Sequence, residues 1–172
     1  MGRDGKEVFI EIFGRTDVGR LRDHNEDTFM VADLSAKKRS LQPEVRRHRV
    51  GDRGTVFAVC DGMGGAAAGE VASQTAADTI YSELASAGEW TTLESLAQQI
   101  GSALEVANER IFKMARRDTT RTGMGTTCSL AAVFEGHLLA AQIGDSRIYV
   151  IRGDRILPVV DTQITIEEPN VI

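Results

Sequence analysis

The 172-residue sequence is poor in cysteine, proline and aromatic residues, and it has no long hydrophobic run. Its two cysteines, Cys60 and Cys128, lie in apolar segments, which argues against a disulfide framework and favours reduced core thiols. No apolar stretch approaches the roughly 18 residues that a membrane-spanning helix needs. The net charge of −5 argues against general nucleic-acid binding. Because the first residues also lack an apolar signal core, we expect a cytoplasmic protein with no membrane or nucleic-acid partner.

The remaining composition is typical of a globular protein, with 42% hydrophobic and 26% charged residues. Apolar runs between turn residues predict strands over residues 8–13, 28–32, 55–60, 126–134, 137–143, 148–151 and 156–160. Apolar residues spaced by three and four predict a helix over residues 66–87 and a second helix capped by Thr91 or Thr92. Residues 33–54 have no steady period and are predicted to form a long loop. Strands, two helices and a strand meander indicate an α+β fold or a layered α/β/β/α arrangement.

The most informative segment is an apolar run that ends at Asp61 and continues into Gly62-Met63-Gly64-Gly65. The glycines let backbone carbonyls and amides approach a ligand closely. Carboxylate and carbonyl oxygens are the ligands that Mg²⁺ and Mn²⁺ prefer, so this segment suggests a metal site. The alternatives are a strand-to-helix turn in which Asp61 caps the helix, and a glycine-rich phosphate loop, for which the Lys-Ser/Thr pair is missing.

A second polar segment precedes the strand predicted at residue 28. It contains Arg22, a planar cation suited to a phosphate, and the adjacent acids Glu26 and Asp27. Since neighbouring residues of a strand point to opposite faces, at most one of the two acids should face a given site. The alternative is a solvated charged loop, which the composition of this segment taken alone favours.

Two further glycine-containing segments lie in the C-terminal half. Gly123 to Thr127 precedes a strand of small residues, as near a cleft or in a structural turn. The strand predicted to end at Ile143 leads into Gly144-Asp145-Ser146-Arg147. Asp145 could bind a metal, or it could sit in a turn and pair with Arg147.

Taken together and in this order, the four segments resemble those of the PPM-type, or type 2C, metal-dependent protein Ser/Thr phosphatases in their bacterial form. The matching segments are Arg22-Asp-His-Asn-Glu26-Asp27, Val59-Cys-Asp61-Gly-Met-Gly-Gly65, Gly125-Thr-Thr127 and Gly144-Asp-Ser-Arg147. The resemblance implies a four-layer α/β/β/α sandwich of antiparallel sheets flanked by helices, with metal ions at one end. It also implies hydrolysis of phosphoserine and phosphothreonine in proteins, including kinase-signalling components, by a metal-activated water.

The resemblance assigns roles to individual residues. Asp61 would bridge two Mn²⁺ or Mg²⁺ ions, and Gly62 would offer its carbonyl oxygen to one of them. Glu26 would hold metal-bound water, and Arg22 would bind the substrate phosphate. Asp145 would serve a third metal position.

The family pattern continues with Asp-His-Ser/Thr, Ser-Asp-Gly and Asp-Asn segments that this sequence does not contain. The aspartates of the last two segments are direct metal ligands in the family. We therefore expect residues 1–172 to form a single, partial phosphatase domain that lacks its C-terminal part. The alternative is a catalytically impaired remnant that binds phosphoproteins or has a regulatory role.

Overall fold

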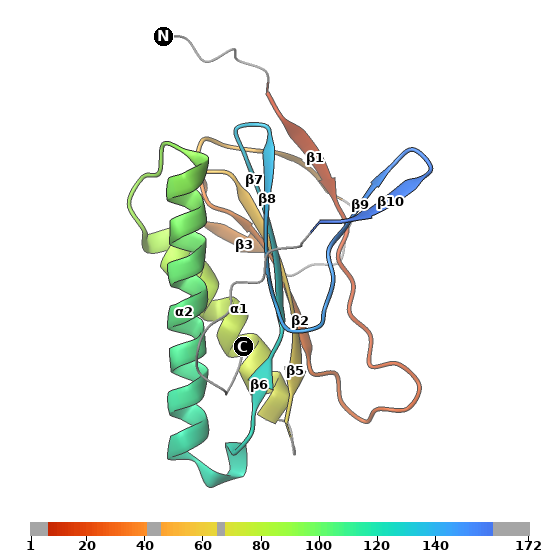
Figure 1. Ribbon diagram of the computed structural model, residues 1–172, viewed down its shortest axis with the longest axis vertical. Helices are drawn as coiled ribbons and strands as arrows, with labels where there is room; N and C mark the ends of the chain where they lie inside the picture. Colours follow the sequence, from red (N-terminus) through yellow and green to blue (C-terminus); the bar gives the residue numbers. More distant parts are fainter. Residues whose placement is uncertain (1–6, 41–45, 65–67, 160–172) are drawn as a thin grey trace.

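The computed structural model describes residues 7–40, 46–64 and 68–159. This part of the chain has an α+β fold, in which antiparallel sheets pack against helices (Figure 1). Its elements are β1 (Phe9–Ile12), β2 (Asp27–Asp33), β3 (Lys38–Ser40), β4 (Arg46–Arg49), β5 (Thr55–Met63), α1 (Ala68–Ser86), α2 (Leu93–Arg117), the short 3-10 helix η1 (Thr119–Arg121), β6 (Gly125–Thr126), β7 (Cys128–Phe134), β8 (His137–Ile143), β9 (Tyr149–Arg152) and β10 (Arg155–Pro158).

The main sheet has the strand order β3-β2-β5-β7-β8, and all of its neighbouring strands are antiparallel. The central strand β5 is longer than the sequence predicts, because β6 pairs with Gly62 and Met63 and extends it beyond Cys60. Asp61 therefore lies inside strand β5, whereas α1 begins at Ala68. Asp61 does not cap that helix.

Both helices of the described part cover the same face of the main sheet (Figure 1). The helix predicted over residues 66–87 is confirmed in the part that the structure describes, and five of its residues at a spacing of four are buried: Ala68, Ala72, Ala76, Ile80 and Leu84. The three alanines among them are small, which lets α1 lie close to β2 and β5. The second helix packs on the first through Leu96, Ile100, Leu104 and Ile111. Thr92 is its N-cap and forms a capping box with Ser95, which confirms one of the two predicted caps.

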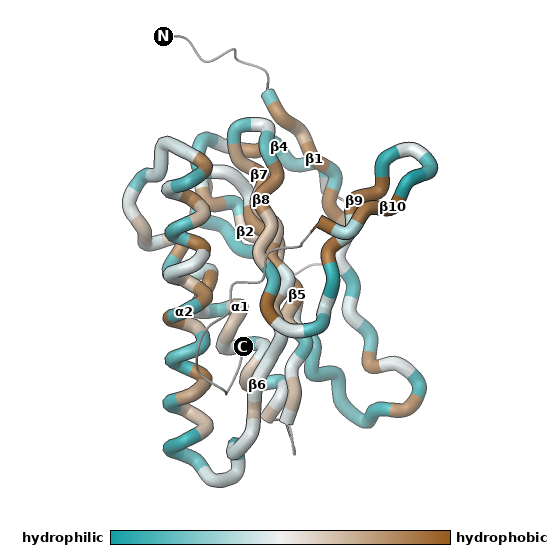
Figure 2. Tube along the Cα trace, viewed as in Figure 1, coloured by the Kyte–Doolittle hydropathy of each residue, from teal (hydrophilic) through white to brown (hydrophobic). Residues whose placement is uncertain are grey.

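The opposite face of the main sheet lies beneath two small antiparallel pairs, β1-β4 and β9-β10, on the side away from the helices (Figure 1). Gly14, just after β1, packs against the ring of Phe29 in β2, since a Cβ on Gly14 would lie 2.7 Å from that ring. The β9-β10 hairpin is apolar but exposed, as Figure 2 shows along both strands, and Ile151 is 71% exposed.

The predicted loop over residues 33–54 is wrong, because it contains β3 and β4. These strands carry basic side chains and have no apolar alternation, so their own sequence gives no strand signal. They form because each finds a partner, β3 on β2 and β4 on β1. The other predicted strands are confirmed within a few residues of their ends, except that Val160 lies outside the described residues. No helix in the described ranges is both long and apolar enough to cross a lipid bilayer.

Candidate metal and phosphate site

The candidate site lies at one end of the main sheet, where the interior strand β2 begins and its neighbour β5 approaches its end. Asp27 is the register partner of Asp61 across these antiparallel strands, so the two carboxylates share one face of the sheet. Burial, then the negative charge of Asp61 and a hydrogen bond between the two carboxyl groups, raise the pKa of Asp27. A cation between two such carboxylates would relieve their repulsion.

Glu26 lies at the same end of the sheet but on its other face, next to the start of α1. A Cβ on Gly69 would lie 2.7 Å from the Glu26 carboxyl group, and a Cβ on Gly62 would lie 2.7 Å from its carbonyl oxygen. The amide N–H of Gly62 donates to that same carbonyl oxygen over 3.1 Å. Only glycine fits at both positions, and the absence of side chains there brings Glu26, β5 and α1 together.

The two adjacent acids therefore point to opposite faces, as strand alternation predicts. Asp27, to which the sequence alone gives no role, is the one that shares a face with Asp61. Strand alternation separates Asp27 from Glu26, but only the pairing register of β2 with β5 shows which of them lies opposite Asp61.

The other predicted site residues are less closely tied to these carboxylates. Arg22 is exposed in the segment before β2 and makes no ion pair with the described residues, so the structure does not bring it to Asp61. Asp145 is exposed in the bend after β8. It does not pair with Arg147, whose guanidinium donates instead to the Ser146 carbonyl oxygen over 2.9 Å.

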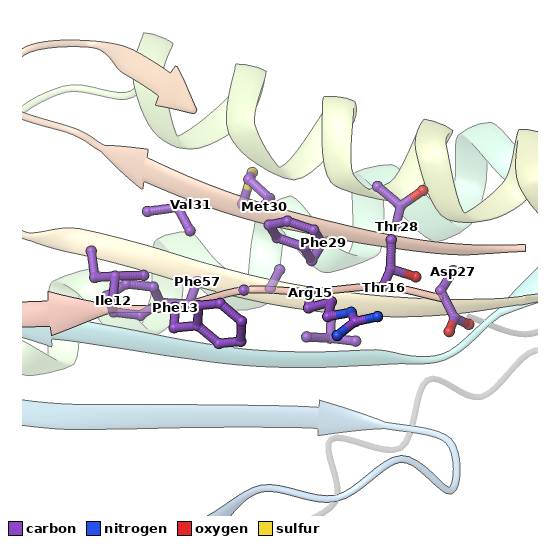
Figure 3. Close-up of a pocket in the computed structure, with 13 residues that line it drawn as sticks. Ile12, Phe13, Arg15, Thr16, Asp27, Thr28, Phe29, Met30, Val31 and Phe57 are labelled. Atoms are coloured by element: carbon purple, nitrogen blue, oxygen red, sulfur yellow. The ribbon is translucent and has the colours of Figure 1, made fainter. Parts of the chain in front are cut away.

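A cavity of about 250 Å³ adjoins Asp27 on the face of the sheet opposite the helices. In Figure 3, Asp27 and Arg15 lie toward one end of this cavity, and Ile12, Phe13 and Val31 lie toward the other. The lining is thus mostly apolar, with charged groups at the end next to the candidate site.

The donor chemistry of the site suits a hard divalent cation, because its groups are carboxylate and carbonyl oxygens. Within the described ranges, however, no three His, Cys, Asp or Glu side chains converge closely enough to enclose a metal ion. The fit is therefore to an open site, in which one or two carboxylates hold an ion that keeps several water ligands, as Mg²⁺ commonly does.

Comparison with known proteins identifies the family of the chain. The profile of the family described as protein phosphatase 2C matches residues 39–163, which is more than half of the chain. The chain belongs to the protein phosphatase 2C family. This family is metal-dependent.

Relatives of this phosphatase 2C chain include two bacterial enzymes. It is 31% identical over 140 residues to the serine/threonine phosphatase stp of Listeria innocua, covering 81% of this chain and 49% of the relative. It is 31% identical over 146 residues to the protein phosphatase PhpP of Streptococcus pneumoniae, covering 84% and 52%. The chain thus spans about half the length of the curated relatives it matches.

Solved structures of phosphatases have the same fold. The serine/threonine phosphatase Stp1 from Staphylococcus aureus matches with a TM-score of 0.66 and 28% identity, over 93% of this chain and 54% of Stp1. The catalytic domain of PstP, in complex with 2 manganese ions, matches with a TM-score of 0.58 at 24% identity, over 90% and 54%, which shows the fold alone. The α+β class with antiparallel sheets is confirmed by these neighbours.

Proposed function

We propose that this domain is a metal-dependent protein phosphatase that hydrolyses phosphoserine and phosphothreonine by attack of a metal-activated water. Family membership supports the reaction class. The observation that carries the proposal is the pair of neighbouring carboxylates, Asp27 and Asp61, at one end of the sheet beside Gly62. Two neighbouring carboxylates repel each other, and a bound cation would offset this repulsion, so such a pair is typical of a functional site.

In this proposal Asp61 would hold two Mn²⁺ or Mg²⁺ ions, Gly62 would contribute its carbonyl oxygen, and Glu26 would hold bound water. Asp145 would serve a third ion. Bound divalent ions would supply positive charge and lower the pKa of a water molecule. The substrates are proteins phosphorylated on Ser or Thr, including components of kinase signalling, and the two buried free cysteines support a reducing, cytoplasmic setting.

The chain's own groups orient the reaction. The exposed guanidinium of Arg22 is available to bind two phosphoryl oxygens, which neutralises charge as the phosphorus is attacked. The water oxygen loses a proton to solvent and forms a bond to phosphorus, the ester P–O bond breaks, and the Ser or Thr oxygen leaves and takes up a proton from solvent. This route forms no covalent enzyme intermediate, so it requires no role for Cys60 or Cys128.

One observation favours the alternative of a phosphoprotein-binding remnant. Within the described residues no three acidic, histidine or cysteine side chains enclose a metal position. Such a remnant would bind phosphoserine or phosphothreonine peptides, for which Arg22 is available, without turnover.

The test compares hydrolysis of p-nitrophenyl phosphate and of a phosphothreonine peptide with and without Mn²⁺. The variants are Asp61→Asn and, as a matched control, Asp52→Asn, which changes an exposed aspartate outside the site. We expect Mn²⁺-dependent turnover that falls at least about 100-fold in Asp61→Asn, because the bridging carboxylate is lost, and that is unchanged in Asp52→Asn.

A folded chain that shows no turnover with Mn²⁺ would contradict the proposal that the domain is an enzyme. If that chain still bound the phosphothreonine peptide, with binding lost in Arg22→Ala, the remnant would be supported. Equal losses in Asp61→Asn and Asp52→Asn would show that charge alone, and not the site, controls the rate.

A further inference from the structure

Thr127, between β6 and β7, makes two hydrogen bonds to the backbone of Asp61. Its amide N–H donates to the Asp61 carbonyl oxygen over 2.9 Å. Its hydroxyl oxygen accepts from the Asp61 amide N–H over 3.1 Å. The pairing of β5 with β6 and β7 is interrupted at Thr127. There the Thr127 side chain accepts the hydrogen bond of the Asp61 amide. The position of the Asp61 carboxylate depends on this backbone.

The same hydroxyl group also reaches the bend that carries Asp145. Thr127 Oγ1 lies 2.8 Å from Ser146 Oγ in a hydrogen bond that either group can donate. The Thr127 methyl group lies against Gly144 in this bend, since a Cβ on Gly144 would lie 2.7 Å from Cγ2. Gly144 has a φ of 90°, so a larger residue there would be strained as well as crowded.

We infer that Thr127 is a positioning residue, whose hydroxyl group fixes the backbone of Asp61 and ties it to the Gly144–Arg147 bend that carries Asp145. The two acids that the proposed function places at different metal positions are then held relative to one another through a single side chain. This inference rests on the proposed function for its purpose, but the hydrogen bonds can be tested without it.

Two variants separate the effect of the Thr127 hydroxyl group from that of its methyl group. Thr127→Val keeps the shape of the side chain and removes both hydrogen bonds of the hydroxyl. Thr127→Ser keeps the hydroxyl and removes the methyl group that packs on Gly144. Ser129→Ala is the matched control, because it deletes a buried hydroxyl from β7 that has no hydrogen-bond partner among the described residues.

The first measurement is residue-resolved amide hydrogen exchange by NMR on the metal-free protein, together with the chemical shifts of residues 144–147. In Thr127→Val we expect the Asp61 amide to exchange about fivefold faster, as loss of one hydrogen bond predicts, and the signals of the bend to shift. Thr127→Ser and Ser129→Ala should keep wild-type exchange at Asp61.

The second measurement is a calorimetric titration of each protein with Mn²⁺. We expect the affinity of Thr127→Val to fall by about tenfold, as is typical when a partner of a metal ligand is removed, and Thr127→Ser to restore it. A wild-type chain that binds no Mn²⁺ would count against the proposed function, while the exchange data would still decide the role of Thr127.

Unchanged Asp61 exchange in Thr127→Val would overturn the inference. So would an equal effect in Thr127→Ser, because the methyl group and not the hydroxyl would then hold the site. Faster exchange in Ser129→Ala as well would show a general loosening of β7 and would likewise overturn it.

Discussion

At the scale of the residue, the neighbouring carboxylates of Asp27 and Asp61 lower the stability of the metal-free protein when both are ionised. Burial and the charge of Asp61 raise the pKa of Asp27 above its ordinary 3.8. The native state therefore binds a proton more tightly than the unfolded state does. The stability that protonated Asp27 contributes is present below pH 3.8 and is lost as the pH rises through the raised pKa.

Asp27→Asn removes this charge and should stabilise the metal-free protein at pH 7. Because Asp27 is largely exposed, we expect only about 0.5 kcal/mol, with the difference shrinking toward zero below pH 4. Urea unfolding with a chelator, measured from pH 3.5 to pH 7, checks both the sign and the pH trend. The control Asp52→Asn should show neither, and a variant less stable than wild type at pH 7 would contradict this reading.

At the scale of the element, the close approach of α1 to β5 depends on small residues. Gly69 in the first turn of α1 lies against Glu26 and the backbone of Gly62. An alanine there would have to displace the carboxyl group or separate the helix from the strand. Gly101 in α2 offers the opposite case, since a Cβ there meets nothing within 4 Å.

The same substitution should therefore have opposite effects in the two helices. Gly69→Ala is expected to destabilise the fold by about 1–3 kcal/mol through overpacking. Gly101→Ala should stabilise it by roughly 0.5–1 kcal/mol, because glycine is a poor helix former. Thermal unfolding of both variants measures this, and stabilisation by Gly69→Ala would mean that the contact with Glu26 is not tight.

At the scale of the whole molecule, the helices and the main sheet enclose a core that contains both cysteines. Cys60 and Cys128 are fully buried, and their neighbouring strands bring the two thiols together. A hydrogen bond to Cys60, with burial, raises the pKa of the Cys128 thiol well above its ordinary value. Both features disfavour the reactive thiolate.

Alkylation should therefore report opening of the core. We expect iodoacetamide at pH 8 to modify the native protein at least about 100-fold more slowly than the urea-unfolded protein, because labelling requires global or near-global unfolding. Mass spectrometry over time gives both rates. Rapid labelling of Cys128 in the native state would show that the sheet opens locally beneath α1.

The sequence by itself determined the helices, most of the strands and the four segments on which the resemblance to the family rests. Apolar spacing places the buried face of α1, and Thr92 marks the start of α2, because these signals are local to each element. Asp61 and Gly62 stand out for the same reason, since an acid and bare glycines after an apolar run are visible along the chain, and Glu26 stands out in the charged segment before a strand.

The tertiary structure alone decided which of these groups meet. The pairing register of β2 with β5 places Asp27, and not Glu26, opposite Asp61. Partner strands make β3 and β4 out of a stretch with no strand pattern. Thr127 reaches Asp61 and Ser146 only because the ladder is interrupted at that residue. Each of these depends on contacts between residues far apart in the chain, which no local spacing encodes.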